Sequence, residues 1–172
     1  MARAKRSRKA ERPLLSGDSA FRDAIAATDR LQLMAGLQAI KDGEGKGQIS
    51  GNDPRHVLGS VAIDDDCKAA YPNDCRWDYV VGYNRAGQAI AHFIEVHSAE
   101  TSEVSKVADK LGWLMKYLQE PPQRKLAAFS REYHWVASGR INIPQHTPQF
   151  KRLNSSLRKL GLRGPVKSLE LI

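Results

Sequence analysis

The stretch WDYVVGYNRAGQAIAHFIEVHSAETSEVSKVADKLGWLMKYL, residues 77–118, decides the fold. Residues 77–83 and 88–97 are runs of apolar, β-branched and aromatic residues, which favour strands. The sequence NRAG between them supplies the glycine that a short hairpin turn needs. Because both runs are apolar at successive positions, we expect other elements to cover the resulting sheet on both faces.

The second half of this stretch predicts an amphipathic helix. Thr101 or Ser102 provides an N-cap, and the sequence EPP at 120–122 ends the helix. Apolar residues recur on one helical face at Val104, Val107, Ala108, Leu111, Leu114, Met115 and Leu118. A hairpin that leads into a crossover helix indicates an α/β fold.

The remaining elements extend this core in both directions. Apolar residues at helical spacing between 18 and 41 predict one long helix, or two short ones broken near Thr28. Further predicted elements are a strand over 57–63 followed by an acidic turn at 64–66, a strand centred on 128–136, a helix that starts at Thr147–Pro148, buries Phe150, Leu153, Leu157 and Leu160 and stops at Gly161, and a short edge strand in 166–172. The expected architecture is a central mixed sheet flanked by helices.

Length and composition are typical of a globular protein. The chain has 172 residues, of which 41% are hydrophobic and 27% charged, and this predicts a single domain over residues 17–172. Residues 1–16 read as a disordered basic arm, because they hold too few apolar residues to bury a core. No apolar run reaches the roughly 20 residues of a membrane span, and the N-terminus lacks the apolar segment of a secretory signal. We therefore expect a cytoplasmic protein without a membrane partner.

Positive charge gathers at the two ends of the chain, which has a formal net charge of +8. Basic clusters of this kind favour a polyanionic partner, DNA or RNA, since each cation that neutralises a phosphate releases a counterion. Two solvated basic segments without a ligand are the alternative. The predicted contacts are Arg3, Lys5, Arg6, Arg8, Lys9 and Arg12 near the N-terminus and Lys151, Arg152, Arg158 and Lys159 near the C-terminus.

Three polar residues mark one end of the predicted hairpin. Glu95 and His97 alternate with Val96 on the second strand, so their side chains point to the same side, whereas His92 points to the opposite side and is expected to be structural. Asp78 begins the first strand and reaches the same end of the sheet. Two carboxylates there make a hard-oxygen site suited to Mg²⁺ or Mn²⁺, which the Val96 carbonyl could complete. His97 would lie beside a metal-bound water as a general base.

The pattern Asp78…Glu95-Val96-His97, at the end of a strand that enters an amphipathic helix, resembles the core of the PD-(D/E)XK nuclease superfamily. The resemblance covers about two-thirds of the chain as element order and three residues as motif. It implies a restriction-endonuclease-like core and a divalent-metal nuclease. Asp78 and Glu95 would be metal ligands, and position 97 would position or activate the water.

The pattern departs from the family at three points. The family's third residue is usually lysine, where this chain has His97, and Lys106 or Lys110 on the following helix could supply the missing ammonium, with Lys106 counted among the catalytic candidates. Trp77 stands where the family tends to have proline. A glutamate that many members contribute from the first helix has only Asp23, Asp29 and Glu44 as counterparts here.

Two other functions remain open at this stage. The same scaffold could bind nucleic acid with a degenerate catalytic site. It could also serve as an interaction module, with the basic arm contacting a protein partner or a second copy of the chain.

Overall fold

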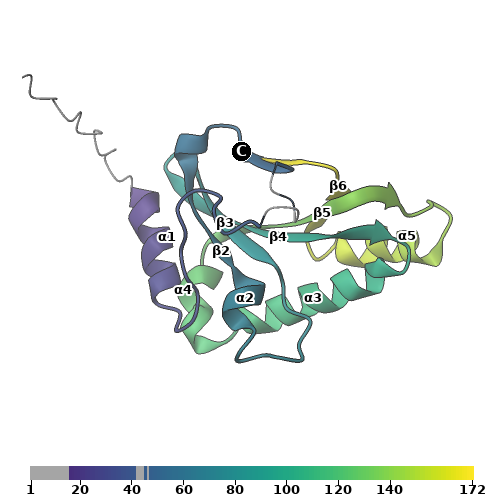
Figure 1. Ribbon diagram of the computed structural model, residues 1–172, viewed down its shortest axis with the longest axis horizontal. Helices are drawn as coiled ribbons and strands as arrows, with labels where there is room; N and C mark the ends of the chain where they lie inside the picture. Colours follow the sequence, from purple (N-terminus) through teal and green to yellow (C-terminus); the bar gives the residue numbers. More distant parts are fainter. Residues whose placement is uncertain (1–15, 42–44, 46) are drawn as a thin grey trace, which may run out of the picture.

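A five-stranded mixed sheet runs through the middle of the computed structural model, which describes residues 16–41, 45 and 47–172 (Figure 1). The first three strands in the sheet are antiparallel, and the last two run parallel to the third. In spatial order they are β2 (Val57–Ala62), β3 (Tyr79–Arg85), β4 (Gln88–Glu100), β5 (Ser130–Asn142) and β6 (Leu162–Val166). The α/β architecture predicted from the sequence is confirmed.

The predicted hairpin joins β3 to β4 through a two-residue turn. Arg85 pairs with Gln88, and both intervening residues, Ala86 with φ 51° and Gly87 with φ 89°, have left-handed backbone conformations. Two consecutive positive φ angles are typical of a type I′ turn, whose twist matches that of the flanking strands. The turn therefore fixes the register that carries Glu95 to the opposite end of the hairpin.

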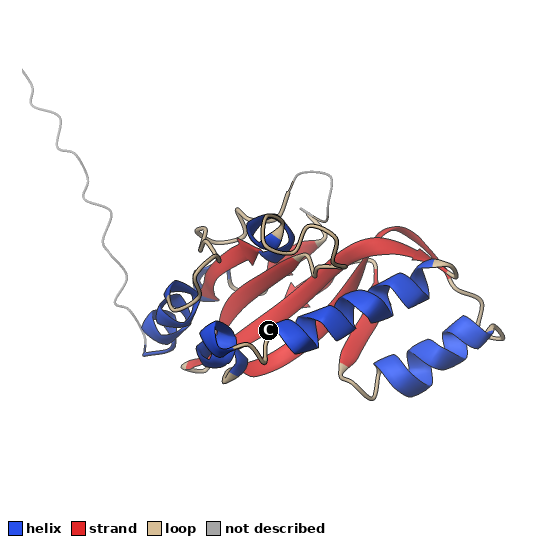
Figure 2. Cartoon of the chain, turned by 90° about the horizontal axis from the view of Figure 1, so that it is seen from below, coloured by secondary structure: helices blue, strands red, loops and turns tan. Residues whose placement is uncertain are grey.

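Helices cover one face of the sheet (Figure 2). They are α1 (Ser16–Ala26), α3 (Glu103–Tyr117), α4 (Arg124–Ala127) and α5 (Pro148–Arg152), the last continued by the π-helical turn η3 (Leu153–Leu157). Thr147 caps α5 as predicted, since its hydroxyl accepts from the Phe150 N–H. Phe21 of α1 lies so close to Gly82 of β3 that a Cβ there would stand 2.6 Å from the phenyl ring. The buried residues of this face include Phe21, Phe93, Val104, Val107, Leu111, Leu114, Leu126, Trp135, Leu153 and Leu157.

The opposite face of the sheet has a different cover. A two-stranded parallel sheet of β1 (Ile49–Gly51) and β7 (Leu169–Leu171) packs there together with the segment around Ile40. Its core includes Ile40, Ile49, Tyr79, Val81, Tyr83, Ile94, Val136 and Leu171. Three short helices complete the described chain, namely η1 (Pro54–His56), α2 (Ile63–Cys67) and η2 (Pro121–Gln123).

The long helix predicted over 18–41 is wrong in its second half. Helix α1 ends at Ala26, and the Thr28 hydroxyl donates to the Ile25 carbonyl and accepts from the Leu31 N–H. Beyond this break Met34 pairs with Ser60 beside β2 in place of a second helix. Leu31 packs in the helix-covered core and Ile40 in the other, so the apolar residues of this segment serve two faces of the sheet and not one face of a helix.

Other differences from the prediction are local. The acidic turn after β2 is the short helix α2, and β6 was not expected. Leu160, predicted to be a core residue, is 49% exposed because the last helix ends before it. Within the described residues, no helix combines the length and the apolar character needed to cross a bilayer.

Candidate functional site

Asp78 and Glu95 lie side by side at one end of the β3–β4 hairpin. Tyr79 pairs with Ile94 in the antiparallel register, which brings the residues just outside that pair, Asp78 and Glu95, together. The Val96 N–H donates to Asp78 Oδ2 at 2.9 Å, and this bond fixes the aspartate against the backbone of β4. The predicted meeting of the two carboxylates is therefore present in the structure.

The third member of this group is Lys110, from the second turn of α3. Its ammonium donates to Asp78 Oδ1 at 2.8 Å and to Glu95 Oε1, so that one cation joins both carboxylates. The helix reaches this position because it follows β4 directly and packs its apolar face on the same side of the sheet. Glu95 is fully buried, whereas the side chains of Asp78 and Lys110 are each 18% exposed.

Burial sets the protonation behaviour of this group. It raises the pKa of Glu95 well above the ordinary value, and the nearby charge of Asp78 adds to this effect. Burial also raises the pKa of Asp78, although the Lys110 ammonium opposes the change. For Lys110 burial alone would lower the pKa, but the combined attraction of Glu95 and Asp78 raises it. Because the two buried carboxylates repel each other when both are ionised, the site favours a cation between them.

His97 and Glu103 form a second pair next to this group. His97 Nε2 lies 2.7 Å from Glu103 Oε2, and His97 Nδ1 lies 3.5 Å from Glu95 Oε1. Hydrogen bonds from Lys106 and then from His97 lower the pKa of Glu103 to about 2. Because Glu103 is ionised at neutral pH, it accepts the hydrogen bond, and His97 carries a proton on Nε2.

Lys106 is placed differently from Lys110. Its ammonium contacts Glu103 at 3.0 Å, and its side chain is 64% exposed. The structure therefore brings Asp78, Glu95, His97 and Lys110 together, with Lys106 joined to them only through Glu103.

A cavity of about 500 Å³ opens over Asp78, His97 and Lys110, whereas the buried Glu95 does not line it. Asp64, the first residue of the acidic triplet, lines it from α2 and receives the Arg76 guanidinium at 2.8 Å on Oδ1. Asp23 and Asp29 are exposed and do not line this cavity, while Glu44 lies outside the described residues. The full lining is Lys41, Asp64, Asp78, Val96, His97, Ser98, Glu103, Lys110 and Ser138.

The predicted basic contacts divide into two sets. Lys151, Arg152, Arg158 and Lys159 are all exposed on the segment that starts with α5. Arg152 donates to the Ser105 hydroxyl at 3.1 Å, so this segment lies beside the N-terminal half of α3, the half that carries Glu103 and Lys110 (Figure 2). The other set, Arg3, Lys5, Arg6, Arg8, Lys9 and Arg12, lies outside the described residues.

The oxygen atoms at the hairpin end fit a divalent cation. Glu95 Oε2 is buried and has no hydrogen-bond partner among the described residues, so one carboxylate oxygen is left for a ligand. Carboxylate oxygens are the donors that Mg²⁺ and Mn²⁺ prefer. Asp78 and Glu95 would hold such an ion, next to the backbone of Val96.

Comparison with known proteins gives no matching family model, no matching curated sequence and no matching solved structure. Functional conclusions for this chain therefore depend on its own residues and their geometry.

Proposed function

We propose that this protein is a divalent-metal-dependent nuclease with a PD-(D/E)XK-like core. The observation that carries the proposal is the convergence of Asp78, Glu95 and Lys110 beside an open cavity, which Asp78 and Lys110 line and behind which Glu95 is buried. The order α1, β2, β3, β4, α3, β5 also agrees with the core that the sequence resemblance implies. Two acids and a lysine are the residue types of that motif, with the lysine contributed by the helix after the strand.

Each residue has a defined part in this proposal. Asp78 and Glu95 hold Mg²⁺ or Mn²⁺, which when bound polarises a phosphodiester and lowers the pKa of water. Lys110 supplies the permanent positive charge that stabilises a phosphate as negative charge develops on it. The Val96 N–H keeps Asp78 oriented through the bond to Oδ2.

His97 acts as a positioning residue in this arrangement. Its Nε2 is hydrogen-bonded to Glu103, and its Nδ1 faces Glu95. Neither ring nitrogen is therefore available to a water in the cavity. The imidazole therefore fixes Glu95 and Glu103 relative to each other. Lys106, paired with Glu103, supports this second pair.

The substrate in this proposal is DNA or RNA, bound in the cytoplasm by its phosphate backbone. The exposed cations that begin with Lys151 lie beside α3 and would extend the contact from the cavity along one side of the molecule. Backbone contacts of this kind predict affinity that falls steeply as salt rises.

One observation favours a second candidate, a nucleic-acid-binding protein that does not cut. Lys110 already joins an oxygen of each carboxylate, and an ammonium in that place satisfies the charge of the site without a metal. Such a protein would bind nucleic acid in a salt-sensitive way and would be indifferent to Mg²⁺ and Mn²⁺.

Cleavage assays on the full chain separate the two candidates. Labelled single- and double-stranded DNA and RNA are incubated with Mg²⁺, Mn²⁺ or EDTA. We expect metal-dependent cleavage that Asp78→Asn and Glu95→Gln each reduce by about a thousandfold, since each removes a metal ligand worth several kcal/mol. Asp109→Asn, which changes an exposed acid on α3, is the control and should cut like the parent. Cleavage unchanged in both site variants would refute the assignment, and salt-sensitive binding without cleavage would establish the second candidate.

A further inference from the structure

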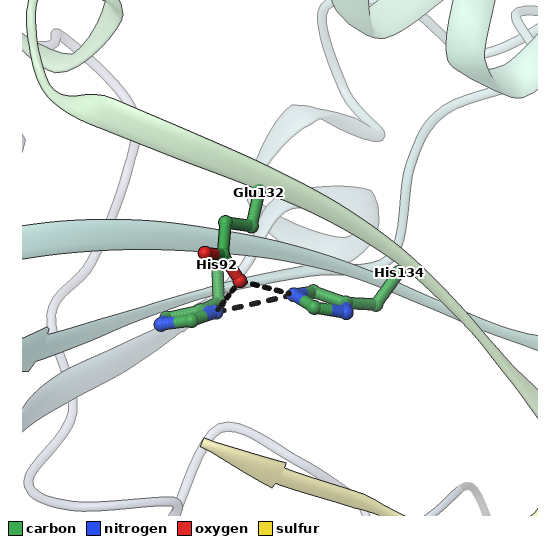
Figure 3. Close-up of side chains that lie close together, drawn as sticks. All are labelled: His92, Glu132 and His134. Atoms are coloured by element: carbon green, nitrogen blue, oxygen red, sulfur yellow. Dashed lines mark hydrogen bonds and ion pairs between the residues drawn. The ribbon is translucent and has the colours of Figure 1, made fainter. Parts of the chain in front are cut away.

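Three metal-ligating side chains meet on the face of the sheet opposite the cavity of Lys110. His92 on β4 pairs in register with Glu132 on β5, and His134 lies two residues further along β5 (Figure 3). His92 and Glu95 are three positions apart on one strand, so their side chains point to opposite faces. This cluster is therefore separate from the proposed nuclease site.

The three ligand atoms are spaced as a single metal ion requires. His92 Nδ1 and His134 Nε2 lie 3.1 Å apart, and each lies 3.5 Å from Glu132 Oε2. A circle through three atoms at these separations has a radius of about 2.0 Å, which matches Zn–N and Zn–O bonds of about 2.0–2.2 Å. One ion close to the plane of the three atoms is thus within bonding distance of all of them.

Both imidazoles are suited to act as ligands at neutral pH. The two rings are 1% and 4% exposed, and burial lowers the pKa of His92 to about 3 and that of His134 to about 4. Each neutral imidazole has one unprotonated nitrogen, and one of the two facing nitrogens holds the proton of their hydrogen bond, so zinc binding requires that ring to carry its proton on the other nitrogen. Tyr83 packs edge-on against His92, with ring centroids 6.2 Å apart, and restricts its orientation.

The surroundings hold the glutamate and leave room for another ligand. Arg85 lies 3.5 Å from Glu132 Oε1, the oxygen that is not part of the triangle. Arg163 contacts Oε2 at 2.8 Å, but its side chain is 62% exposed and free to turn toward solvent. A cavity of about 200 Å³ adjoins all three residues and is also lined by Glu170, which leaves space for a water molecule as fourth ligand.

We propose that His92, Glu132 and His134 form a Zn²⁺ site with one open coordination position. Two imidazole nitrogens and one carboxylate suit zinc, whereas Mg²⁺ prefers an all-oxygen shell. The bound ion would join β4 to β5 beneath the segment 162–172. In its absence the two histidines share an N–H···N hydrogen bond and Glu132 pairs with arginine.

Zinc titration of the purified full chain tests this site. To remove the contribution of the hairpin carboxylates, the parent for this experiment carries Asp78→Asn and Glu95→Gln. After EDTA treatment and dialysis, calorimetric titration with ZnCl₂ should show one bound equivalent. X-ray absorption of the loaded protein should show two imidazole nitrogens and oxygen at about 2.0–2.2 Å. A protein that binds no zinc, or that binds it without imidazole ligands, overturns the proposal.

Variants of the cluster complete the test. In the same background, His134→Gln and Glu132→Gln should each weaken zinc binding by more than the about 10–100-fold that loss of a supporting residue costs. His146→Gln, which changes an exposed histidine outside the cluster, should bind like the parent. Circular dichroism identifies any variant that fails to fold. If a variant does not fold, the X-ray absorption spectrum of the zinc-loaded parent still tests whether imidazoles bind the ion. Equal affinity in all folded variants would show that zinc binds elsewhere and would refute the site.

Discussion

Lys110 is the residue on which the proposed nuclease site depends. It offers one ammonium to two carboxylates, one of them fully buried, in a place where partial burial weakens the screening of their repulsion by water. The same charge is well placed to face a phosphate that enters the cavity. Stability requires Lys110 to neutralise the two carboxylates, whereas catalysis requires it to face the phosphate. A bound divalent cation would meet the first of these two demands.

Replacing Lys110 by methionine separates these two demands. Without the ammonium, Asp78 and Glu95 face each other uncompensated, and we expect the free energy of unfolding to fall by about 3 kcal/mol at neutral pH. Urea unfolding with and without Mn²⁺ measures this change. Mn²⁺ should stabilise Lys110→Met more than it stabilises the parent, because the ion replaces the missing cation.

Lys106→Met is the matched control for that substitution. Its ammonium is exposed and, among the described carboxylates of the site, contacts only Glu103, so the change in stability should stay below about 1 kcal/mol. If both lysine variants lose the same stability, or if Mn²⁺ acts equally on both, then Lys110 does not have the role described.

At the scale of elements, the β3–β4 hairpin determines where the catalytic candidates meet. Its turn contains one unfavourable choice, since Ala86 has a φ of 51° that alanine adopts at a cost. Asparagine tolerates this conformation and is the preferred residue before glycine in a type I′ turn.

Ala86→Asn should therefore stabilise the protein by about 0.5–1 kcal/mol. The opposite substitution at the neighbouring position, Gly87→Ala, places a side chain at φ 89° and should destabilise it by about 1 kcal/mol. Thermal unfolding at fixed pH measures both. A loss of stability in Ala86→Asn would contradict the turn type assigned here.

The elements that the sequence predicts well are those whose signals are local. The hairpin and α3 are continuous in sequence: the two strands are unbroken apolar runs around a turn, and α3 has a helical period of apolar residues. The segment 27–40 misleads because Leu31 and Ile40 enter different cores, which only the folded sheet defines. Strand β6 is short and contains Pro165, so its pairing with β5 depends on tertiary contacts.

The same distinction applies to the functional residues. Asp78 and Glu95 could be paired from the hairpin register alone. Lys106 is the lysine counted among the catalytic candidates from the sequence, whereas helical phase favours Lys110, which is three residues after Val107 and four before Leu114, both buried. The cluster of His92, Glu132 and His134 could not be predicted, because it depends on the register between two parallel strands joined by α3.

At the scale of the whole molecule, the central sheet separates two polar clusters of different chemistry. The helix-covered face holds carboxylates and ammonium groups at an open cavity, which suits hard cations and phosphates. The opposite face holds neutral imidazoles around one carboxylate. The two clusters share strand β4, so metal binding at one face is expected to stabilise the strand that carries ligands for the other.

The buried histidines predict how the stability of the metal-free protein depends on pH. Burial depresses the pKa of His92 and His134 to about 3 and about 4 from the ordinary value of 6.5, so the unfolded chain binds more protons than the folded one below about pH 7. Their contribution to stability is complete above pH 6.5 and is lost as the pH falls toward these values, by about 2 kcal/mol per histidine between pH 7 and pH 5. The raised pKa values of Asp78 and Glu95 act in the opposite direction, because the folded state then binds more protons than the unfolded one.

A comparison of parent and variant isolates the histidine contribution from that of the carboxylates. In EDTA, urea unfolding of the parent and of His134→Gln at pH 7, 6 and 5 should show that the variant loses about 2 kcal/mol less over this range. The difference isolates His134 because Asp78, Glu95 and the charged groups around the cluster, Glu132, Arg85 and Arg163, are common to both proteins. Parallel stability curves for the two proteins would mean that His134 is not held neutral by burial, and the cluster would then lack the free lone pairs that a zinc ligand needs.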